Sequence, residues 1–316
     1  MLVTGAGGQL GRDLVDVLSG RVADGGGAPA GRPWDVAAFD HARLDVSRRA
    51  AVLTAVEGVR PDVIVHAAAW TAVDACEGDP DRAFAVNALG TRHVAEAARR
   101  TGAHVVYVST DYVFDGTSAR PYREWDATNP LSVYGRSKLG GEAELDPAST
   151  VVRTSWVCGA HGANMAKTVL RLADGPGPLR FVDDQRGSPT FTADLAVTVA
   201  ALARDRLPGV FHVTNSGTTT WYGFARAVLA AAGHDPDRVE AIATAELDPP
   251  RPAPRPANSV LDNAALRLMG MELLADWHDG LDRLVDVLRS AAPPSVEPPR
   301  VAAAPGAAPG PSKEVR

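Results

Sequence analysis

The sequence contains few cysteines, few lysines and no long apolar run. Its two cysteines, Cys76 and Cys158, lie far apart and neither belongs to a C-x-x-C pair, so we expect reduced thiols in a cytoplasmic protein rather than a disulfide framework. No run of about 18 apolar residues occurs, so no membrane-spanning helix is predicted. The N-terminal residues also lack a basic segment followed by an apolar one, and the sequence therefore predicts no secretory signal.

Positive charge is also scarce. Lysine and arginine together number 32 against 38 aspartates and glutamates, and the formal net charge is −6. With no long cationic stretch, this balance argues against electrostatic binding to nucleic acid. Hydrophobic residues still make up 45% of the 316 residues, which is enough for a full globular core. Lysine is confined to Lys138, Lys167 and Lys313, so the position of each one is informative.

In the first half of the chain, short β-branched runs alternate with amphipathic helical patterns. Short apolar strands separated by helices are typical of a parallel sheet that is covered on both faces. We therefore expect an α/β fold with a doubly wound parallel sheet, whose ligand crevice lies at the carboxyl ends of the strands. The expected strands are Met1–Val3, Val36–Phe39, Val63–Val65, Val105–Val108 and Val151–Arg153, and the expected helices are Gly11–Leu18, Arg48–Glu57, Asp79–Arg100 and Tyr134–Leu145.

The second half is less regular and predicts a smaller lobe. We expect a dinucleotide-binding domain over residues 1–157, with elements near 190–215 returning to it, and mainly a substrate lobe over 158–290. The Pro- and Ala-rich residues 291–316 predict a disordered tail, and Gly20–Pro33 predicts a loose loop. The expected helices are Asn164–Ala173, Thr192–Ala203, Trp221–Ala232 and Trp277–Ser290, and the expected strands are Leu179–Val182 and Val210–Thr214.

A glycine-rich turn follows the first expected strand. The spacing Gly5-x-x-Gly8-x-x-Gly11 is a variant of the dinucleotide-binding pattern. Glycines permit a tight turn from strand to helix and let the backbone approach a pyrophosphate, which then sits on the positive end of the helix. Because the chain continues in βα rhythm, we interpret this turn as the pyrophosphate site of a nicotinamide cofactor.

Asp40 comes at the end of the second expected strand. A carboxylate there can accept a hydrogen bond from a ribose 2′-OH, which favours NADH. Arg12, His41 and Arg43 are close enough in sequence to meet a 2′-phosphate, which favours NADPH. The residues alone leave both cofactors open.

Tyr134 and Lys138 form a Y-x-x-x-K pair at the start of an expected helix, and their spacing places both on one face. A free tyrosine, with a pKa near 10, is a poor acid or base at neutral pH. A neighbouring ammonium, together with an oxidised nicotinamide, would lower that pKa. The phenol can then protonate an oxyanion as hydride reaches a carbonyl carbon. Thr110 follows the strand Val105–Val108, where its hydroxyl can polarise the same carbonyl.

Together these motifs resemble the extended short-chain dehydrogenase/reductases and, within them, the dTDP-4-dehydrorhamnose reductase family. The resemblance runs in order from residue 5 to about 262. It implies a Rossmann-like fold, reduction of the C4 keto group of a dTDP-deoxysugar, and NADPH as cofactor with NADH as the alternative. The matching stretches are GAGGQLG, RPDVIVHAAAWTAVDACE, FAVNALGT, STDYVFDG, NPLSVYGRSKLGGE, VVRTSWVCG, NMAKTVLRLA, DDQRGSPT, GTTTWYGFA and RPANSVLD.

The resemblance also implies roles for the matching positions. It implies a catalytic set of Thr110, Tyr134 and Lys138. The expected cofactor contacts are Gly5 and Asp40, which were argued above from the residues, and the implied Gly8, Gln9, Leu10, Gly11, Asp45, Val46, Ala69, Trp70 and Thr71, together with Tyr134 and Lys138. The implied substrate contacts, besides Thr110, are Asp111, Tyr112, Trp156, Asn164, Lys167 and Arg255.

Some relatives of this kind join through magnesium bound by acidic surface residues. Asp13 is a candidate here, but the sequence offers no clear acidic partners near 189–194 or 277–279, so it does not support a Mg²⁺ site. We expect a monomer or a weak homodimer. Three other functions fit parts of the pattern: a 4-ketoreductase of another deoxysugar, a non-catalytic NADP-binding subunit like the regulatory subunit of methionine adenosyltransferase, and an epimerase that retains its NAD.

Overall fold

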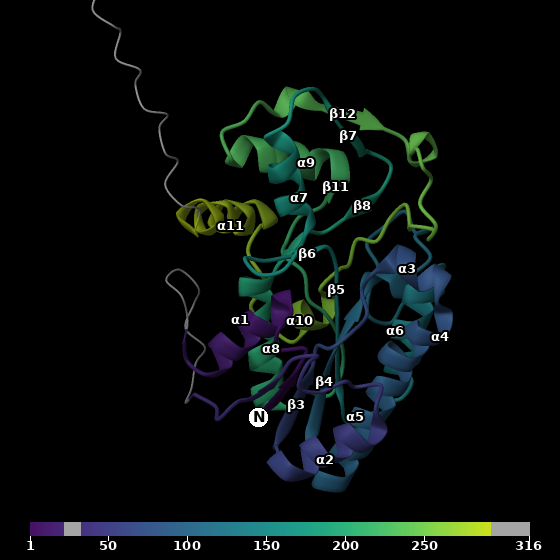
Figure 1. Ribbon diagram of the computed structural model, residues 1–316, viewed down its shortest axis with the longest axis vertical. Helices are drawn as coiled ribbons and strands as arrows, with labels where there is room; N and C mark the ends of the chain where they lie inside the picture. Colours follow the sequence, from purple (N-terminus) through teal and green to yellow (C-terminus); the bar gives the residue numbers. More distant parts are fainter. Residues whose placement is uncertain (22–32, 292–316) are drawn as a thin grey trace, which may run out of the picture.

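The computed structural model describes residues 1–21 and 33–291, and a six-stranded sheet runs through its centre (Figure 1). The strand order is β10-β5-β4-β3-β1-β2, and each neighbouring pair is parallel. The doubly wound parallel sheet predicted from the sequence is confirmed. Its strands are β1 (Leu2–Thr4), β2 (Ala37–Phe39), β3 (Val63–His66), β4 (His104–Thr110), β5 (Thr150–Thr154) and β10 (Gly209–His212).

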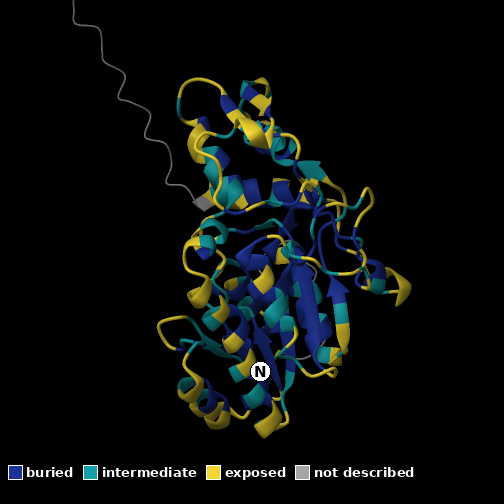
Figure 2. Cartoon of the chain, turned by 90° about the vertical axis from the view of Figure 1, so that its right-hand side faces the viewer, coloured by how far each residue is buried: buried dark blue, intermediate teal, exposed yellow. Residues whose placement is uncertain are grey.

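Helices cover both faces of this sheet. The helices α1 (Gln9–Leu18) and α8 (Thr192–Asp205) pack on one face, and α2 (Arg49–Val59) and α5 (Gly90–Thr101) pack on the other. Successive strand residues point to opposite faces, so Val3 belongs to the first core and Leu2 to the second. The central strands β1, β3, β4 and β5 are almost wholly buried, as the dark blue arrows in Figure 2 show. This explains why their sequences are short apolar runs.

The helical segment predicted at Asp79–Arg100 is interrupted. It consists of α4 (Pro80–Phe84), a π-helical segment, η1 (Ala85–Leu89), and α5. Asn87 lies in the wider turn and is buried; its side chain bonds both backbone groups of Trp70 (2.8 and 3.1 Å) and the Ser137 hydroxyl (2.9 Å). These partners come from distant parts of the chain, so the local pattern did not predict the interruption. Two further helices, α3 (Val73–Gly78) and α6 (Val133–Glu142), pack beside this segment.

A smaller lobe lies above the carboxyl ends of the strands (Figure 1). Its core is formed by α7 (Met165–Ala173), α9 (Trp221–Ala231) and α11 (Trp277–Ala291), together with the parallel pair β7 and β12. The sequence predicted the three helices and β7 to within one residue at each end. Very short elements were not predicted. The remaining elements are β6 (Val157–Cys158), β7 (Leu179–Val182), β8 (Arg186–Gly187), β9 (Thr190–Phe191), β11 (Thr219–Thr220), β12 (Val239–Ile242), α10 (Ala264–Leu268), η2 (Asp111–Val113), η3 (Pro236–Arg238) and η4 (Thr244–Glu246).

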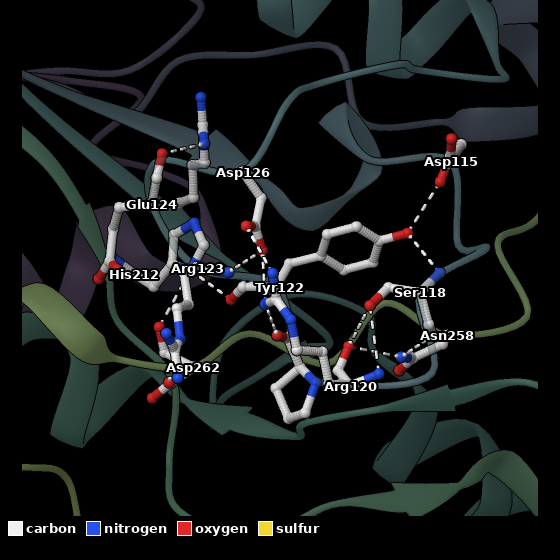
Figure 3. A network of polar contacts seen from close by, with 12 residues as sticks. Asp115, Ser118, Arg120, Tyr122, Arg123, Glu124, Asp126, His212, Asn258 and Asp262 are labelled. Carbon is white, nitrogen blue, oxygen red and sulfur yellow. Dashed lines mark hydrogen bonds and ion pairs between the residues drawn. The ribbon is translucent and has the colours of Figure 1, made fainter.

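A polar network fixes the segment that follows β4 and η2 onto the rest of the molecule (Figure 3). Tyr122 stacks on Phe114 with ring centroids 4.2 Å apart, and its hydroxyl donates to Asp115 at 2.8 Å. The carboxylate of Glu124 accepts hydrogen bonds from the backbone N–H groups of His212 (3.1 Å) and Ala265 (2.9 Å). These contacts tie the segment after η2 to Phe114 on one side and to the backbone at His212 and Ala265 on the other.

Two predictions concern residues that the structure does not describe. The loop predicted at Gly20–Pro33 falls mostly on residues 22–32, and the tail predicted at 291–316 falls almost wholly on 292–316; both lie outside the described ranges. No helix within those ranges combines the length and apolar character that a membrane crossing needs.

Candidate active site

The glycine turn between β1 and α1 requires glycine at two positions. Gly5 has a φ of +69°, and a Cβ on it would lie 2.7 Å from the backbone nitrogen of Ala68. A Cβ on Gly11 would overlap the carbonyl oxygen of Gly5. The turn therefore brings the start of α1 against β1 and β3 with no side chain between them. This leaves the first N–H groups of α1 facing a crevice, as a pyrophosphate site needs.

One cavity of about 610 Å³ lies along the carboxyl ends of β1, β2 and β3. Asp40 lines it and also accepts the backbone N–H of Arg43 at 2.9 Å. The Arg43 guanidinium, by contrast, lies over the Phe39 ring and donates to the Ala38 carbonyl, and only His41 of the three basic candidates lines the cavity. The predicted cofactor residues that line this cavity are Gly5, Gly8, Asp40, Asp45, Val46, Ala69 and Trp70.

A second cavity of about 420 Å³ continues from the first, since both are lined by Gly5, Gly8, Ala67 and Ala69. It extends across the carboxyl ends of β4 and β5, where a doubly wound sheet binds its ligand. Residues predicted to bind the cofactor and residues predicted to act on the substrate both line this second cavity. Those lining it are Gly5, Gly8, Gln9, Leu10, Gly11, Ala69, Thr71, Thr110, Asp111, Tyr112, Tyr134, Lys138 and Trp156.

Helix α6 presents Tyr134 and Lys138 to this second cavity. The hydroxyl of Ser132 caps the helix by accepting the Gly135 N–H at 3.1 Å. A Cβ at Gly135 would overlap the carbonyl oxygen of Tyr112, so glycine lets α6 lie directly against η2. Tyr134 is 8% exposed and Lys138 only 2%. The Lys138 ammonium donates to the Val108 carbonyl at 2.7 Å, which fixes it at the end of β4.

Burial decides the protonation of both groups. It lowers the pKa of Lys138 to about 7, against the opposing effect of Glu142. It raises the pKa of Tyr134 well above its ordinary value, and hydrogen bonding with Thr110 only partly opposes this. The sequence predicted that an ammonium and an oxidised nicotinamide together lower the pKa of Tyr134; in the protein without cofactor burial has the larger effect, and the pKa in the complex stays a prediction. The phenol therefore carries its proton, which is the form that a reduction consumes.

Thr110 and Asp111 lie together at the end of β4. The Thr110 hydroxyl donates to Asp111 Oδ1 at 3.0 Å and accepts the Tyr112 N–H at 3.2 Å. Asp111 is 2% exposed, and burial raises the pKa of its carboxyl to about 6. Within the described residues, Asp111 Oδ2 has no hydrogen-bond partner. The site thus contains a buried carboxyl group, and hydrogen bonding with Ser259 and Thr110 only partly opposes the effect of burial on its pKa.

Three predicted substrate contacts do not line either cavity. Asn164 caps α7 and donates to Gln9 Oε1 at 2.9 Å, beside the glycine turn. The Lys167 ammonium donates to the carbonyls of Ala160 and Gly162. Arg255 pairs with Asp74 of α3 and lies next to Tyr112. Their contact with substrate stays a prediction.

The sequence did not single out several residues that shape the site. Arg82 lines the first cavity with its guanidinium 4.5 Å from the centre of the Trp70 ring. Trp221 lines the second and stacks on Trp156, although the two are 65 residues apart in the chain. Asn87 orders the loop that joins both cavities through its bonds to Trp70. The residues around Asn87 and Trp221 belong to the motifs FAVNALGT and GTTTWYGFA, but only their tertiary contacts reveal these roles.

The candidate magnesium residue lies away from the crevice. Asp13 faces His161 at 3.8 Å, and burial raises the pKa of its carboxyl. The nearby Asp194 is bound by the Arg283 guanidinium at 2.6 Å. In the part of the chain that the structure describes, no group of three or more His, Cys, Asp or Glu side chains could hold a metal ion.

Comparisons with known proteins agree on one family. The model of the RmlD substrate binding domain matches residues 1–290. A dTDP-4-dehydrorhamnose reductase of Streptomyces griseus is 42% identical over 308 residues, covering 95% of this chain and 97% of the relative. A probable dTDP-4,6-dihydroxy-2-methyloxan-3-one 4-ketoreductase of Streptomyces antibioticus is 40% identical, with coverages of 93% and 97%.

A solved structure gives the same answer. The crystal structure of dTDP-4-dehydrorhamnose reductase from Bacillus anthracis in complex with NADP is 36% identical and superposes with a TM-score of 0.82. The match covers 90% of this chain and 97% of that one. This chain therefore belongs to the RmlD substrate binding domain family, within the extended short-chain dehydrogenase/reductases.

Proposed function

We propose that this chain is an oxidoreductase that reduces the C4 keto group of dTDP-4-dehydro-L-rhamnose to give dTDP-L-rhamnose, with NADPH as reductant. One observation carries the proposal: Thr110, Tyr134 and Lys138 line a single cavity that continues into the glycine-lined crevice. The names of the relatives supply the substrate, and the NADP in the Bacillus anthracis structure supports the cofactor.

The crevice fits a dinucleotide. Gly8 to Gly11 open α1 toward the pyrophosphate, and Asp45 and Val46 would border the adenine. Ala69, Trp70 and Thr71 would follow the cofactor past β3. His41 and Arg82 are the basic side chains that line the cavity with Asp40, so they are the groups able to meet a 2′-phosphate, while Asp40 keeps NADH as an alternative. The bound cofactor supplies the hydride for the carbonyl carbon.

The proton comes from Tyr134. Its raised pKa keeps the phenol protonated, so it can protonate the oxyanion that forms at the former keto oxygen. The Thr110 hydroxyl orients that oxygen and stabilises the developing charge. Lys138, in its protonated form, would hold the ribose hydroxyls of the cofactor and stabilise the tyrosinate left behind. Asp111, Tyr112 and Trp156 would contact the sugar from the other walls of the cavity.

Replacing Tyr134 tests the mechanism. Tyr134→Phe removes the proton donor and keeps the ring, so turnover should fall by about 10²- to 10⁴-fold while the Kd for NADPH changes little. NADPH oxidation with dTDP-4-dehydro-L-rhamnose measures turnover, and quenching of protein fluorescence measures cofactor binding. Tyr222→Phe on α9, outside both cavities, is the matched control and should keep full activity. A Tyr134→Phe protein as active as the unmodified one would disprove the assignment.

The substrate itself has one close rival. The relative from Streptomyces antibioticus carries the name of a 4-ketoreductase for a different dTDP-sugar, at nearly the same identity. Nuclear magnetic resonance of the product distinguishes the two, because the sugar and the configuration at C4 can be read from its couplings. A non-catalytic NADP-binding subunit would bind cofactor and give no turnover with either sugar.

We also propose that residues 1–157, together with elements near 190–215 that return to them, form the cofactor region, and that 158–290 form mainly the substrate region. We further propose that the protein is a monomer or weak homodimer and that it works in the cytoplasm. Cys76 and Cys158 are free and buried, as expected of a reducing compartment. Sedimentation analysis over a range of protein concentrations measures the oligomeric state.

A further inference from the structure

The backbone at Trp156 has an unusual conformation. Trp156 connects β5 to β6 with a φ of +45°, in the left-handed region that large side chains rarely adopt. Such strain persists only where the surroundings impose it, and it gathers at ligand sites. Here Ser155 on one side donates to the Ser188 carbonyl at 2.6 Å, and the Trp156 carbonyl accepts the Thr190 N–H. The segment 188–190 therefore holds this turn in place.

Two other segments fix the indole of Trp156. The Trp221 indole stacks on it with ring centroids 3.5 Å apart and an interplanar angle of 4°. On β8, a Cβ added to Gly187 would overlap the Trp156 indole and lie 2.5 Å from its Nε1. Gly187 pairs with Thr219 on β11, and Trp221 begins α9 directly after β11. The β8–β11 pair thus carries both groups that confine the ring.

Both indoles line the cavity that also contains Thr110 and Tyr134. Flat aromatic faces bury large apolar areas at little entropic cost when they are held rigid, so a fixed indole is suited to pack against a ring of the ligand. Both indoles also pack against the hydrophobic core of the smaller lobe, which supports them from behind.

We propose that Gly187 and Trp221 are positioning residues for Trp156: together they hold its indole as a rigid wall of the substrate cavity and thereby set the affinity for the sugar nucleotide. The inference rests on the proposed function for the identity of the ligand. The confinement of the indole can be tested without any turnover.

The first test uses Gly187→Ala and Trp221→Ala. Stacked tryptophans give an exciton couplet in far-ultraviolet circular dichroism, and both variants should lose it. The KM for dTDP-4-dehydro-L-rhamnose should rise roughly tenfold, and the Kd for dTDP-L-rhamnose measured by calorimetry should weaken equally. The Kd for NADPH should stay unchanged.

Trp221→Phe, which restores an aromatic face, should recover most of the affinity. Trp125→Ala, at a 60% exposed tryptophan outside both cavities, is the control and should match the unmodified protein.

The decisive test is a double-mutant cycle. If Gly187 acts only by leaving room for the indole, Gly187→Ala should weaken dTDP-L-rhamnose binding in the unmodified protein and cost nothing further in a Trp156→Ala background. Additive losses would overturn the proposal, as would a Gly187→Ala protein with an intact couplet and unchanged affinity. If Gly187→Ala fails to melt cooperatively, the Trp221→Ala and Trp221→Phe pair decides by the same readouts. Failure of the proposed function would appear instead as no turnover by the unmodified protein.

Discussion

We expect Lys138 to make cofactor binding depend on pH. Burial lowers the pKa of its ammonium to about 7, so the free protein loses this charge as the pH rises through neutrality. The neutral amine has fewer donors for the ribose hydroxyls and no charge for an anionic cofactor. We expect the Kd for NADPH to increase between pH 6 and pH 8.5, and Lys138→Met to weaken binding and flatten this dependence.

Fluorescence titration at each pH measures this effect. Lys167→Met is the matched control, because the Lys167 ammonium donates to the carbonyls of Ala160 and Gly162 and lines neither cavity. It should keep the pH dependence of the unmodified protein. A Kd that stays constant over this range in the unmodified protein would contradict the expectation.

Asp111 is expected to reduce stability at neutral pH. Burial raises its pKa from 3.8 to about 6, so between these values the folded protein binds a proton that the unfolded chain has released. Its stabilising contribution is therefore complete below the unfolded pKa and is lost as the pH rises through 6. Asp111→Asn should raise the free energy of unfolding by about 1 to 3 kcal/mol at pH 7.5 and by almost nothing at pH 4. Denaturant melts at both pH values test this; a less stable variant at pH 7.5 would refute it.

At the residue scale, the sequence allows positions to be predicted where the geometry is local. Tyr134 and Lys138 lie four residues apart, so their shared helix face follows from helical geometry. The raised pKa of Tyr134 in the protein without cofactor was not predictable, because burial depends on what the rest of the chain packs over the phenol. Sequence spacing contains no measure of that burial.

At the scale of elements, helix α6 depends on close packing against the π-helical segment. A Cβ at Gly141 would overlap the Tyr107 hydroxyl and lie 2.5 Å from the carbonyl oxygen of Asn87. Gly141→Ala should therefore push α6 outward and lower the free energy of unfolding by about 1 to 3 kcal/mol. Gly58→Ala in α2 is the control: no atom lies within 4 Å of its Cβ position, so it should stabilise by about 0.5 to 1 kcal/mol. Thermal melts of both variants would show opposite shifts, and shifts of the same sign would contradict this packing.

Elements with a strong internal pattern were predictable, and elements defined by a partner were not. The pattern at Trp221–Ala232 corresponds to α9 to within one residue. In contrast, β8 and β11 have two residues each and exist only because they pair with one another. The same holds for the π-helical segment, where Asn87 reaches Trp70 and Ser137. Such contacts arise from tertiary packing, which no local periodicity encodes.

At the scale of the whole molecule, the crevice is bounded by parts of the chain that are far apart in sequence. The cofactor side comes from residues before 90, whereas Trp156 and Trp221 reach the substrate side from later segments. A part-buried ion pair joins the early and late segments: Asp74 of α3 binds Arg255, 181 residues away. We expect a second role for Arg255, because it lies beside Tyr112, which lines the second cavity.

Arg255 and Arg251 together test that second role. Both guanidiniums bond Asp74, but the Arg255 side chain is 15% exposed and the Arg251 side chain 56%. If Arg255 also meets the diphosphate of the sugar nucleotide, Arg255→Met should raise the KM for that substrate by about tenfold or more, since charge-assisted hydrogen bonds are worth about 1.5 to 3 kcal/mol. The Kd for NADPH should not change. Arg251→Met removes the exposed partner of the same carboxylate and should leave the KM within about twofold. Steady-state kinetics decide between the two roles, because equal effects of both substitutions would mean that Arg255 serves only to tie Asp74 to the later segment.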